Sequence, residues 1–228
     1  AKLCARVFLY APLMTTKCET IIIGGGAMGS AAAWQLAARG KQVTLLERFS
    51  MGHAHGSSHG ASRNFSVSYT DPGYVAMLVE AQRLWRELES ESGVSLLEPV
   101  GIVNHGANPN YDLIHKTLAM AGIPSEFLPP TEAESRWPGI RFDGRVLFTP
   151  EAGRINADAS MRVIQAAARA HGAEIQPNTT VTQLDVRSED LVRVITNDEV
   201  FEAKRVIVTV GAWTAKLLNG IVPLPPLV

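Results

Sequence analysis

The sequence has few cysteines and no excess of charge of either sign. Cys4 and Cys18 are the only cysteines in 228 residues, too few for a disulfide framework or for zinc-finger spacing. This usage favours a reducing compartment, and the cytoplasm is the expected location. The 21 basic and 22 acidic residues leave a net charge of −1, so the basic surface of a nucleic-acid binder is missing. We expect a small-molecule partner and no nucleic acid.

Long apolar runs are also missing. None approaches the roughly 20 residues that cross a bilayer, and we expect no membrane association. Residues 1–13 pair two basic residues with a short apolar segment but lack a convincing signal-peptide cleavage site. Because Met14 stands just before the first strand pattern, we interpret residues 1–13 as an upstream extension. The 46% hydrophobic content of the whole chain is ample for the core of a globular protein.

A glycine-rich turn follows the first strand. The apolar, β-branched run 18–23 predicts a buried parallel strand, and the small residues after the turn predict a helix closed by Gly40. Gly24, Gly26 and Gly29 fit the pattern G-x-G-x-x-G. In this pattern the three glycines serve a tight turn, a close approach to a diphosphate and helix–strand packing. The turn therefore predicts a diphosphate held by backbone N–H groups and the helix dipole.

The second predicted strand, 42–46, ends in Glu47. A carboxylate about 20 residues beyond such glycines can accept hydrogen bonds from an adenosine ribose. It also disfavours a 2′-phosphate, so FAD or NAD is favoured over NADP. The alternative is an ordinary βαβ unit in which Glu47 is a surface charge. Because strand, turn, helix, strand and acid are all in register, we favour dinucleotide binding.

Residues 51–63, MGHAHGSSHGASR, contain three of the six histidines and allow three interpretations. Gly56, Ser58 and Gly60 fit the G-x-S-x-G pattern of a hydrolase nucleophile. That nucleophile stands on a sharp turn between a strand and a helix, and no apolar strand directly precedes Ser58. The hydrolase interpretation is therefore disfavoured.

The histidines of this loop, His53, His55 and His59, could instead bind a metal. No acidic or cysteine ligand is near them in the sequence, so we expect no metal, and we expect His53 and His55 to be solvated loop residues. A third interpretation explains more of the composition. Small residues together with Ser, His and Arg suit a loop that lies against a flat cofactor ring.

Several motifs together resemble the monomeric sarcosine oxidase and N-methyltryptophan oxidase group of the D-amino-acid oxidase superfamily. They are GGGAMG with Glu47, GSSHGASR, the helix PGYVAMLVEAQRLWRELE, RWPGI, FTPEAGRI and VIVTVGAW, between about residues 18 and 219. The resemblance implies FAD as cofactor and oxidation of an amine C–N bond. It implies an α/β fold with a Rossmann-like FAD-binding domain of the glutathione-reductase type and an inserted α+β substrate-domain segment.

The resemblance also assigns residues to the cofactor. Those that would hold its ADP half are Gly24, Gly26, Gly29, Glu47 and Arg48. Those that resemble positions at the adenine and the pyrophosphate are Val181, Gly211, Ala212 and Trp213. Those that would line the flavin are Ser57, Ser58, His59 and Arg63.

His59 and Arg63 match the histidine and arginine beside the reactive ring and are the catalytic candidates. A cation there would stabilise the charge of the reduced ring. From the residues alone, Arg63 could equally be a loop arginine paired with a surface acid.

The substrate contact departs from the family. In the family the pattern Arg, apolar, apolar, Arg places a second arginine on the substrate carboxylate. Here RNFS puts Ser66 at that position, and a serine cannot form a bidentate pair with a carboxylate. The resemblance implies an amine or N-methyl amino acid as substrate and molecular oxygen as electron acceptor, and Ser66 argues against a carboxylate held by that contact.

The patterns divide the chain into four parts. Residues 1–13 are the extension, 14–97 the first part of the FAD-binding domain, 98–154 a partial substrate-domain segment and 155–228 the second part of the FAD-binding domain. Since the family continues beyond this point, we expect an N-terminal portion whose exposed edges favour self-association. The alternative function is a non-catalytic or incomplete dinucleotide-binding module that needs a partner or a missing C-terminal half.

Other patterns predict local structure. Asp71 should begin a helix whose core-facing residues are Tyr74, Met77, Leu78, Ala81, Leu84, Trp85 and Leu88. Thr131 and Glu134 predict a capping box. Residues 191–203 predict a hairpin turned at Asn197 and Asp198, followed by a separate buried strand over 204–210.

Overall fold

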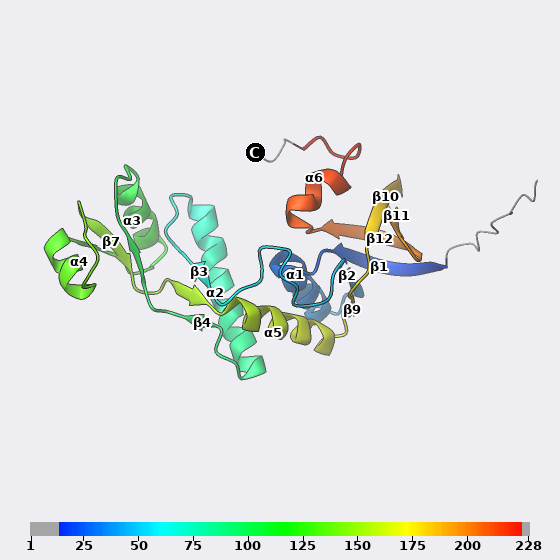
Figure 1. Ribbon diagram of the computed structural model, residues 1–228, viewed down its shortest axis with the longest axis horizontal. Helices are drawn as coiled ribbons and strands as arrows, with labels where there is room; N and C mark the ends of the chain where they lie inside the picture. Colours follow the sequence, from blue (N-terminus) through cyan, green and yellow to red (C-terminus); the bar gives the residue numbers. More distant parts are fainter. Residues whose placement is uncertain (1–13, 225–228) are drawn as a thin grey trace, which may run out of the picture. The chain divides into compact units, whose positions relative to one another are not determined.

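The computed structural model describes residues 14–224, which form two compact units (Figure 1). Of the described residues, the first unit contains 14–57 and 164–224, and the second contains 58–163. The predicted upstream extension, residues 1–13, lies outside the described residues. Between residues 14 and 224, no helix combines the length and the apolar character needed to cross a membrane.

A six-stranded mixed sheet forms the centre of the first unit. Its order is β10-β11-β12-β1-β2-β9. The bounds are β1 Thr15–Ile23, β2 Val43–Leu46, β9 Glu174–Gln176, β10 Val181–Ser188, β11 Leu191–Thr196 and β12 Val200–Val208. Strands β12, β1, β2 and β9 pair in parallel, whereas β11 pairs antiparallel with both β10 and β12. The sheet confirms the predicted mixed α/β class.

Apolar strands and small-residue helices explain this unit. Ile21 and Leu46 in the central strands are almost fully buried, and Phe201 of β12 packs in the same cluster. The predicted helix after the glycine turn is α1, Ala27–Ala38, and Gly40 follows it with a φ of 73° in the left-handed region. The other helices are α5 Ala157–Ala170, which begins in the second unit, the 3-10 turn Gly211–Trp213 and α6 Thr214–Leu217.

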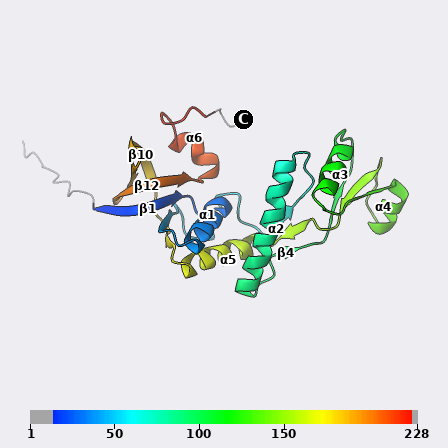
Figure 2. The same ribbon diagram turned by 180° about the vertical axis from the view of Figure 1, so that it is seen from behind.

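The predicted hairpin is present, but its second arm is longer than expected. Strands β11 and β12 pair antiparallel, with Ile195 opposite Val200. The prediction of a separate strand over 204–210 is wrong, because residues 200–208 form the single strand β12. One edge of β12 pairs with β11, and the other pairs in parallel with β1, beside which β12 lies in Figure 2. A strand has two hydrogen-bonding edges, so one long strand serves as both the hairpin arm and the parallel neighbour of β1.

The second unit contains two three-stranded sheets, in the orders β3-β8-β4 and β5-β7-β6. Its strands are β3 Arg63–Phe65, β4 Leu97–Glu98, β5 Ile102–Asn104, β6 Glu126–Leu128, β7 Val146–Thr149 and β8 Gly153–Ile155. Its helices are α2 Pro72–Ser92, α3 Tyr111–Met120 and α4 Pro130–Arg136. Leu118 of α3 and Leu147 of β7 are fully buried in a core that also takes Val75 of α2.

The face of α2 that packs on this core differs from the predicted one. Asp71 caps the helix as predicted, since its Oδ1 accepts hydrogen bonds from the backbone N–H groups of Gly73 and Tyr74. Tyr74 and Met77 are more than half exposed, whereas Val75 is buried, so the prediction for Tyr74 and Met77 is wrong. The buried face contains Val75, Leu78, Trp85 and Leu88. Tyr74 and Met77 each come one residue before a member of this face, so their side chains point to a different side of the helix.

The predicted capping box is also wrong. Helix α4 begins at Pro130, with Pro129 at the N-cap position and no side-chain cap among the described residues. Proline suits the first helical position because its fixed φ fits and its missing N–H is not needed there. Thr131 therefore lies inside the helix, and Oε1 of Glu134 instead accepts a hydrogen bond from the N–H of Phe142 (3.3 Å).

A carboxylate joins α2 to strand β4. Oε1 of Glu89 accepts hydrogen bonds from the N–H groups of Leu96 (2.7 Å) and Leu97 (2.8 Å), and Oε2 lies 2.6 Å from Arg86. Burial alone would raise the pKa of Glu89, but the N–H groups of Leu97 and Leu96 and the charge of Arg86 outweigh it and lower the pKa. The ionised form is thus favoured in the folded state.

We expect Glu89→Ala to lower the free energy of unfolding by about 1–3 kcal/mol at pH 7, because two backbone donors lose their acceptor. Since the folded pKa lies below the unfolded one, this contribution is present above the ordinary glutamate value of 4.5 and is lost as the pH falls below it. Urea unfolding of both proteins at pH 7 and at lower pH measures the difference. Glu87→Ala, which removes an exposed ion pair with Arg83, is the control and should cost under about 0.5 kcal/mol. A difference that persists unchanged at low pH would contradict this role of Glu89.

Candidate functional site

The glycine turn between β1 and α1 packs against Thr209, the residue directly after β12. Gly24 has a φ of 102°, and its N–H donates to the carbonyl of Leu46 over 2.8 Å. A Cβ at Gly24 would come within 2.6 Å of the carbonyl oxygen of Thr209. The hydroxyl of Thr209 lies 2.9 Å from the carbonyl oxygens of both Ile23 and Gly24 and can donate to either. Only glycine fits this turn.

Gly29 permits close packing of α1 on the turn. A Cβ there would overlap the carbonyl oxygen of Gly24 and would lie 2.6 Å from Oγ1 of Thr209. The role predicted for the third glycine of the pattern, close helix–strand packing, is confirmed by these contacts.

A buried polar network holds the carbonyl side of the turn. The hydroxyl of Ser30 donates to the carbonyl of Gly25 over 2.9 Å, and Nε2 of Gln165 donates to the same carbonyl over 3.2 Å. Ser30 is fully buried and Gln165 is 6% exposed. Sequence reasoning missed Gln165. The only signal was one amide among the small apolar residues of α5.

The N-terminus of α1 is suited to an anion. Gly26 occupies the N-cap position, and within the described chain no side chain caps the helix and no acidic residue stands in its first turn. Met28 in that turn is 75% exposed. The positive end of the helix dipole favours an anion, and this helix end suits the diphosphate of a dinucleotide.

Glu47 follows β2 and lies beneath the turn. Its side chain is 8% exposed, and Oε2 accepts a hydrogen bond of 2.6 Å from the N–H of Gly25. Oε1 accepts one of 2.9 Å from the N–H of Phe49 and lies 3.2 Å from Nε2 of His53. The alternative in which Glu47 is a surface charge is therefore wrong. A carboxylate has about four acceptor positions, so the two backbone donors and the contact with His53 leave a position on Oε2 for a ligand hydroxyl.

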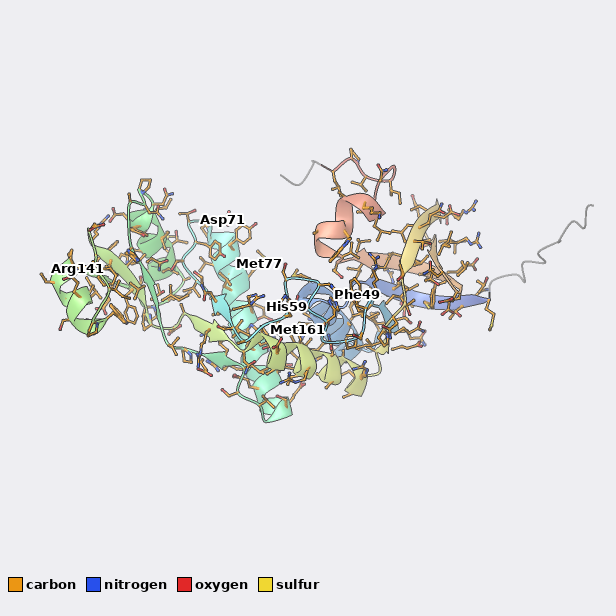
Figure 3. All side chains as sticks on the ribbon, viewed as in Figure 1. Phe49, His59, Asp71, Met77, Arg141 and Met161 are labelled. Atoms are coloured by element: carbon orange, nitrogen blue, oxygen red, sulfur yellow. The ribbon has the colours of Figure 1, made fainter. Side chains whose placement is uncertain are left out.

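Aromatic rings gather beside this carboxylate. Phe49, labelled in Figure 3, has its ring centroid 4.8 Å from that of His53, 4.4 Å from that of His55 and 6.3 Å from that of Trp213. The guanidinium carbon of Arg48 lies 5.2 Å from the Phe49 centroid. The expectation that His53 is a solvated loop residue is wrong, because its side chain is only 18% exposed and faces Glu47. His55 is exposed, as expected.

The loop that opens the second unit is held by hydrogen bonds with Asp158 and with the side chain of Arg63. The N–H of Gly60 donates to Oδ1 of Asp158 (2.7 Å), and the N–H of Asp158 donates to the carbonyl of Gly60 (3.1 Å). The guanidinium of Arg63 is exposed and donates to the carbonyls of His59 (2.6 Å) and Ser62 (2.7 Å). The side chain of Arg63 thus holds the backbone of this loop in place through these two carbonyls. Its predicted position beside a flavin stays a prediction, as does that of His59.

The geometry of residues 51–63 bears on the two disfavoured interpretations, a hydrolase nucleophile and a metal site. Ser58 lies in a stretch of bends with no helix directly after it, unlike a hydrolase nucleophile. Among residues 14–224, no three side chains of His, Cys, Asp or Glu come together as metal ligands. The rings of His53 and His55 stack instead, with centroids 5.7 Å apart.

The remaining candidates lie on both units. In the first unit, Val181 begins β10, half-buried, and Gly211 begins the 3-10 turn with a φ of 54°. Ser57 is exposed at the end of the first segment of this unit. In the second unit, Oγ of Ser66 accepts a long hydrogen bond of 3.4 Å from the N–H of Ser68. The ligand contacts predicted for these residues stay predictions.

Residues 19–228 match the model of a family described as FAD dependent oxidoreductase. The chain is 31% identical over 222 residues to monomeric sarcosine oxidase of Bacillus sp. (strain B-0618), covering 93% of this chain and 57% of that protein. It is 28% identical over 205 residues to N-methyl-L-tryptophan oxidase of Yersinia pestis (strain Pestoides F), covering 88% and 55%. The solved structure of NikD, an unusual amino acid oxidase, superposes with a TM-score of 0.78 at 28% identity, covering 90% and 54%. The chain spans little more than half the length of these proteins.

We expect Gly29→Ala to destabilise the first unit by about 1–3 kcal/mol or more, because the added Cβ overlaps the Gly24 carbonyl and forces α1 away from the turn. Urea unfolding followed by circular dichroism measures the change. Gly144→Ala is the matched control, since no atom lies within 4 Å of a Cβ there and its φ is not in the left-handed region. Equal stability of the Gly29→Ala variant and the unsubstituted chain would show that α1 does not need this close approach.

Proposed function

The chain belongs to the family of FAD-dependent oxidoreductases, as its motifs predict, and from this membership we propose that it binds FAD and oxidises the C–N bond of a small amine. Members of this family bind FAD, and the oxidases among its relatives act on CH–NH bonds. The observation that carries the proposal for this chain is the buried Glu47 beneath an uncapped helix N-terminus. A diphosphate and an adjacent ribose require these two groups.

The proposed cofactor contacts form two groups. In the first unit, the turn from Gly24 to Gly29 and the N-terminus of α1 would hold the diphosphate, and Oε2 of Glu47 would accept a ribose hydroxyl. Arg48 would also contact the ADP half, Val181 the adenine, and Gly211 and Trp213 the pyrophosphate side. Ser57, Ser58, His59 and Arg63 would line the flavin.

When bound, FAD would supply the two-electron oxidation of an amine to an imine, and the two electrons and two protons removed from the amine would reduce oxygen to hydrogen peroxide. The protein's part is to position and to stabilise charge. Arg63 would place a permanent cation near the ring without any proton transfer, since its guanidinium stays charged. Water would then hydrolyse the released imine to a carbonyl compound and a smaller amine.

Binding of FAD tests the first half of the proposal. We expect the purified chain to bind FAD in equilibrium dialysis, to show flavin bands in its visible spectrum and to release FAD when ADP is added. Glu47→Gln should weaken binding about 10- to 100-fold, because charge-assisted hydrogen bonds contribute about 1.5–3 kcal/mol. Glu174→Gln, on the exposed end of β9, is the control and should bind as the unsubstituted chain does. Binding of NAD with no binding of FAD would overturn the cofactor assignment.

Peroxide formation tests the second half. The full-length gene product, loaded with FAD, should release hydrogen peroxide with at least one member of a panel of primary and secondary amines. FAD binding without amine-dependent loss of the flavin bands would leave a dinucleotide-binding module and overturn the oxidation. Loss of the bands without peroxide would indicate a dehydrogenase that uses another electron acceptor.

The identity of residue 66 predicts the charge of the preferred substrate. We expect Ser66→Arg to raise kcat/KM for N-methyl amino acids, relative to the matching N-methylamines without a carboxylate, by about 10- to 100-fold. The reason is that an arginine can form a bidentate pair with a carboxylate and a serine cannot. Ser66→Ala adds no charge and should leave the ratio unchanged. An unchanged ratio in Ser66→Arg would mean that position 66 does not face the substrate.

A further inference from the structure

We propose that His53 is a positioning residue that orients the carboxylate of Glu47 toward the ribose hydroxyls of the bound nucleotide. This inference rests on the proposed binding of FAD and concerns a residue outside the glycine pattern. His53 reaches Glu47 because the chain turns back on itself. Gly52 has a φ of 80°, in the left-handed region that favours glycine, and the N–H of His53 donates to the carbonyl of Ser50 over 3.3 Å.

The hydrogen bonds of His53 select one tautomer. The backbone N–H of His55 donates to Nδ1 of His53 over 3.1 Å, so Nδ1 carries no proton. In a neutral imidazole the other nitrogen then carries it, and Nε2 is the donor 3.2 Å from Oε1 of Glu47. The imidazole is therefore a fixed bridge between the loop backbone and the carboxylate.

The rings around His53 keep it in place. Phe49 lies against one side of the imidazole, with centroids 4.8 Å apart, and His55 stacks near it with centroids 5.7 Å apart. At 18% exposure the His53 side chain has little room for another rotamer. A donor on a side chain held in this way can orient its acceptor, as outer-shell partners orient metal ligands.

The donors on Glu47 are divided unequally between its two oxygens. Oε1 receives the N–H of Phe49 and faces Nε2 of His53, whereas Oε2 receives the N–H of Gly25. This division fixes the plane of the carboxylate and leaves the remaining acceptor position on Oε2, next to the glycine turn. Without His53 the two backbone hydrogen bonds remain, but Oε1 loses the contact that limits smaller rotations of the carboxylate. The loss would then appear in recognition of the ribose rather than in binding as a whole.

Two nucleotides separate ribose recognition from the rest of binding. ADP carries both ribose hydroxyls, and 2′,3′-dideoxy-ADP carries neither. The ratio of their dissociation constants, measured by calorimetry on the chain, reports the hydroxyl contact alone. We expect the unsubstituted chain to prefer ADP by about 10- to 100-fold, the range of a charge-assisted hydrogen bond.

Three substitutions separate the two nitrogens of His53. His53→Ala removes both. His53→Asn retains an acceptor near the position of Nδ1, and His53→Gln retains a donor near the position of Nε2. We expect the preference for ADP to fall about fivefold or more in His53→Ala and His53→Asn and to stay within about twofold in His53→Gln. The affinity for 2′,3′-dideoxy-ADP should stay within about twofold in all three variants. His105→Ala, in the second unit, is the matched histidine control and should change neither constant.

Each outcome either supports or overturns the inference. A chain that binds neither ADP nor FAD overturns the proposed function, and this inference with it. A chain that prefers ADP, and whose His53→Ala variant keeps that preference, overturns the inference alone. Equal weakening of both nucleotides would show that His53 only stabilises the loop, and failure of His53→Gln to keep the preference would show that the Nε2 donor is not the group that acts. Circular dichroism confirms folding of each variant before binding is measured.

Discussion

The structure of the first unit depends on a carboxylate that is buried and therefore needs hydrogen-bond donors around it. A buried charge without partners costs several kcal/mol, so the donors around Glu47 are a condition of the fold. They come from Gly25 in the glycine turn and from Phe49 and His53 in the following loop. The backbone of Glu47 is also held, because its N–H donates to Gln176 and its carbonyl accepts from Thr179. The side chain of this one residue thus joins the turn and the loop, and its backbone joins them to β9 and the residues after it.

The glycine turn was largely predictable because its constraints are local. The spacing of Gly24, Gly26 and Gly29, with an acid after the second strand, indicates a strand, a tight turn and a closely packed helix. The structure agrees in each of these, and the family is indicated by the same motifs. The fold class was predictable for a related reason, since apolar strands alternating with small-residue helices indicate a largely parallel sheet.

Gln165 and strand β12 were mispredicted for a different reason, because both depend on contacts between residues far apart in the sequence. Gln165 stands 140 positions from Gly25, whose carbonyl it contacts, and no periodicity reports such a pairing. The sequence of β12 does not indicate that one of its edges pairs with β1, and its residue pattern therefore predicts two strands in place of one. A loop rich in glycine and serine is usually solvated, and this composition predicts the same for His53. Its burial comes from the rings of Phe49 and His55, which the composition of the loop does not indicate.

The two parts of the candidate site are held by interactions of different strength. Around the glycine turn the hydrogen bonds of Glu47, Ser30 and Gln165 are buried, where a lost partner is costly and geometry is fixed. In the loop of the second unit the bonds of Arg63 and of Gly60 with Asp158 are exposed, and exposed polar contacts contribute little net free energy. A ligand that offered Arg63 a better acceptor could therefore displace its bonds to the His59 and Ser62 carbonyls at small cost. The segment expected to meet the reactive ring is accordingly the one that a bound ring can most readily rearrange, while the segment expected to hold the diphosphate is set before any ligand arrives.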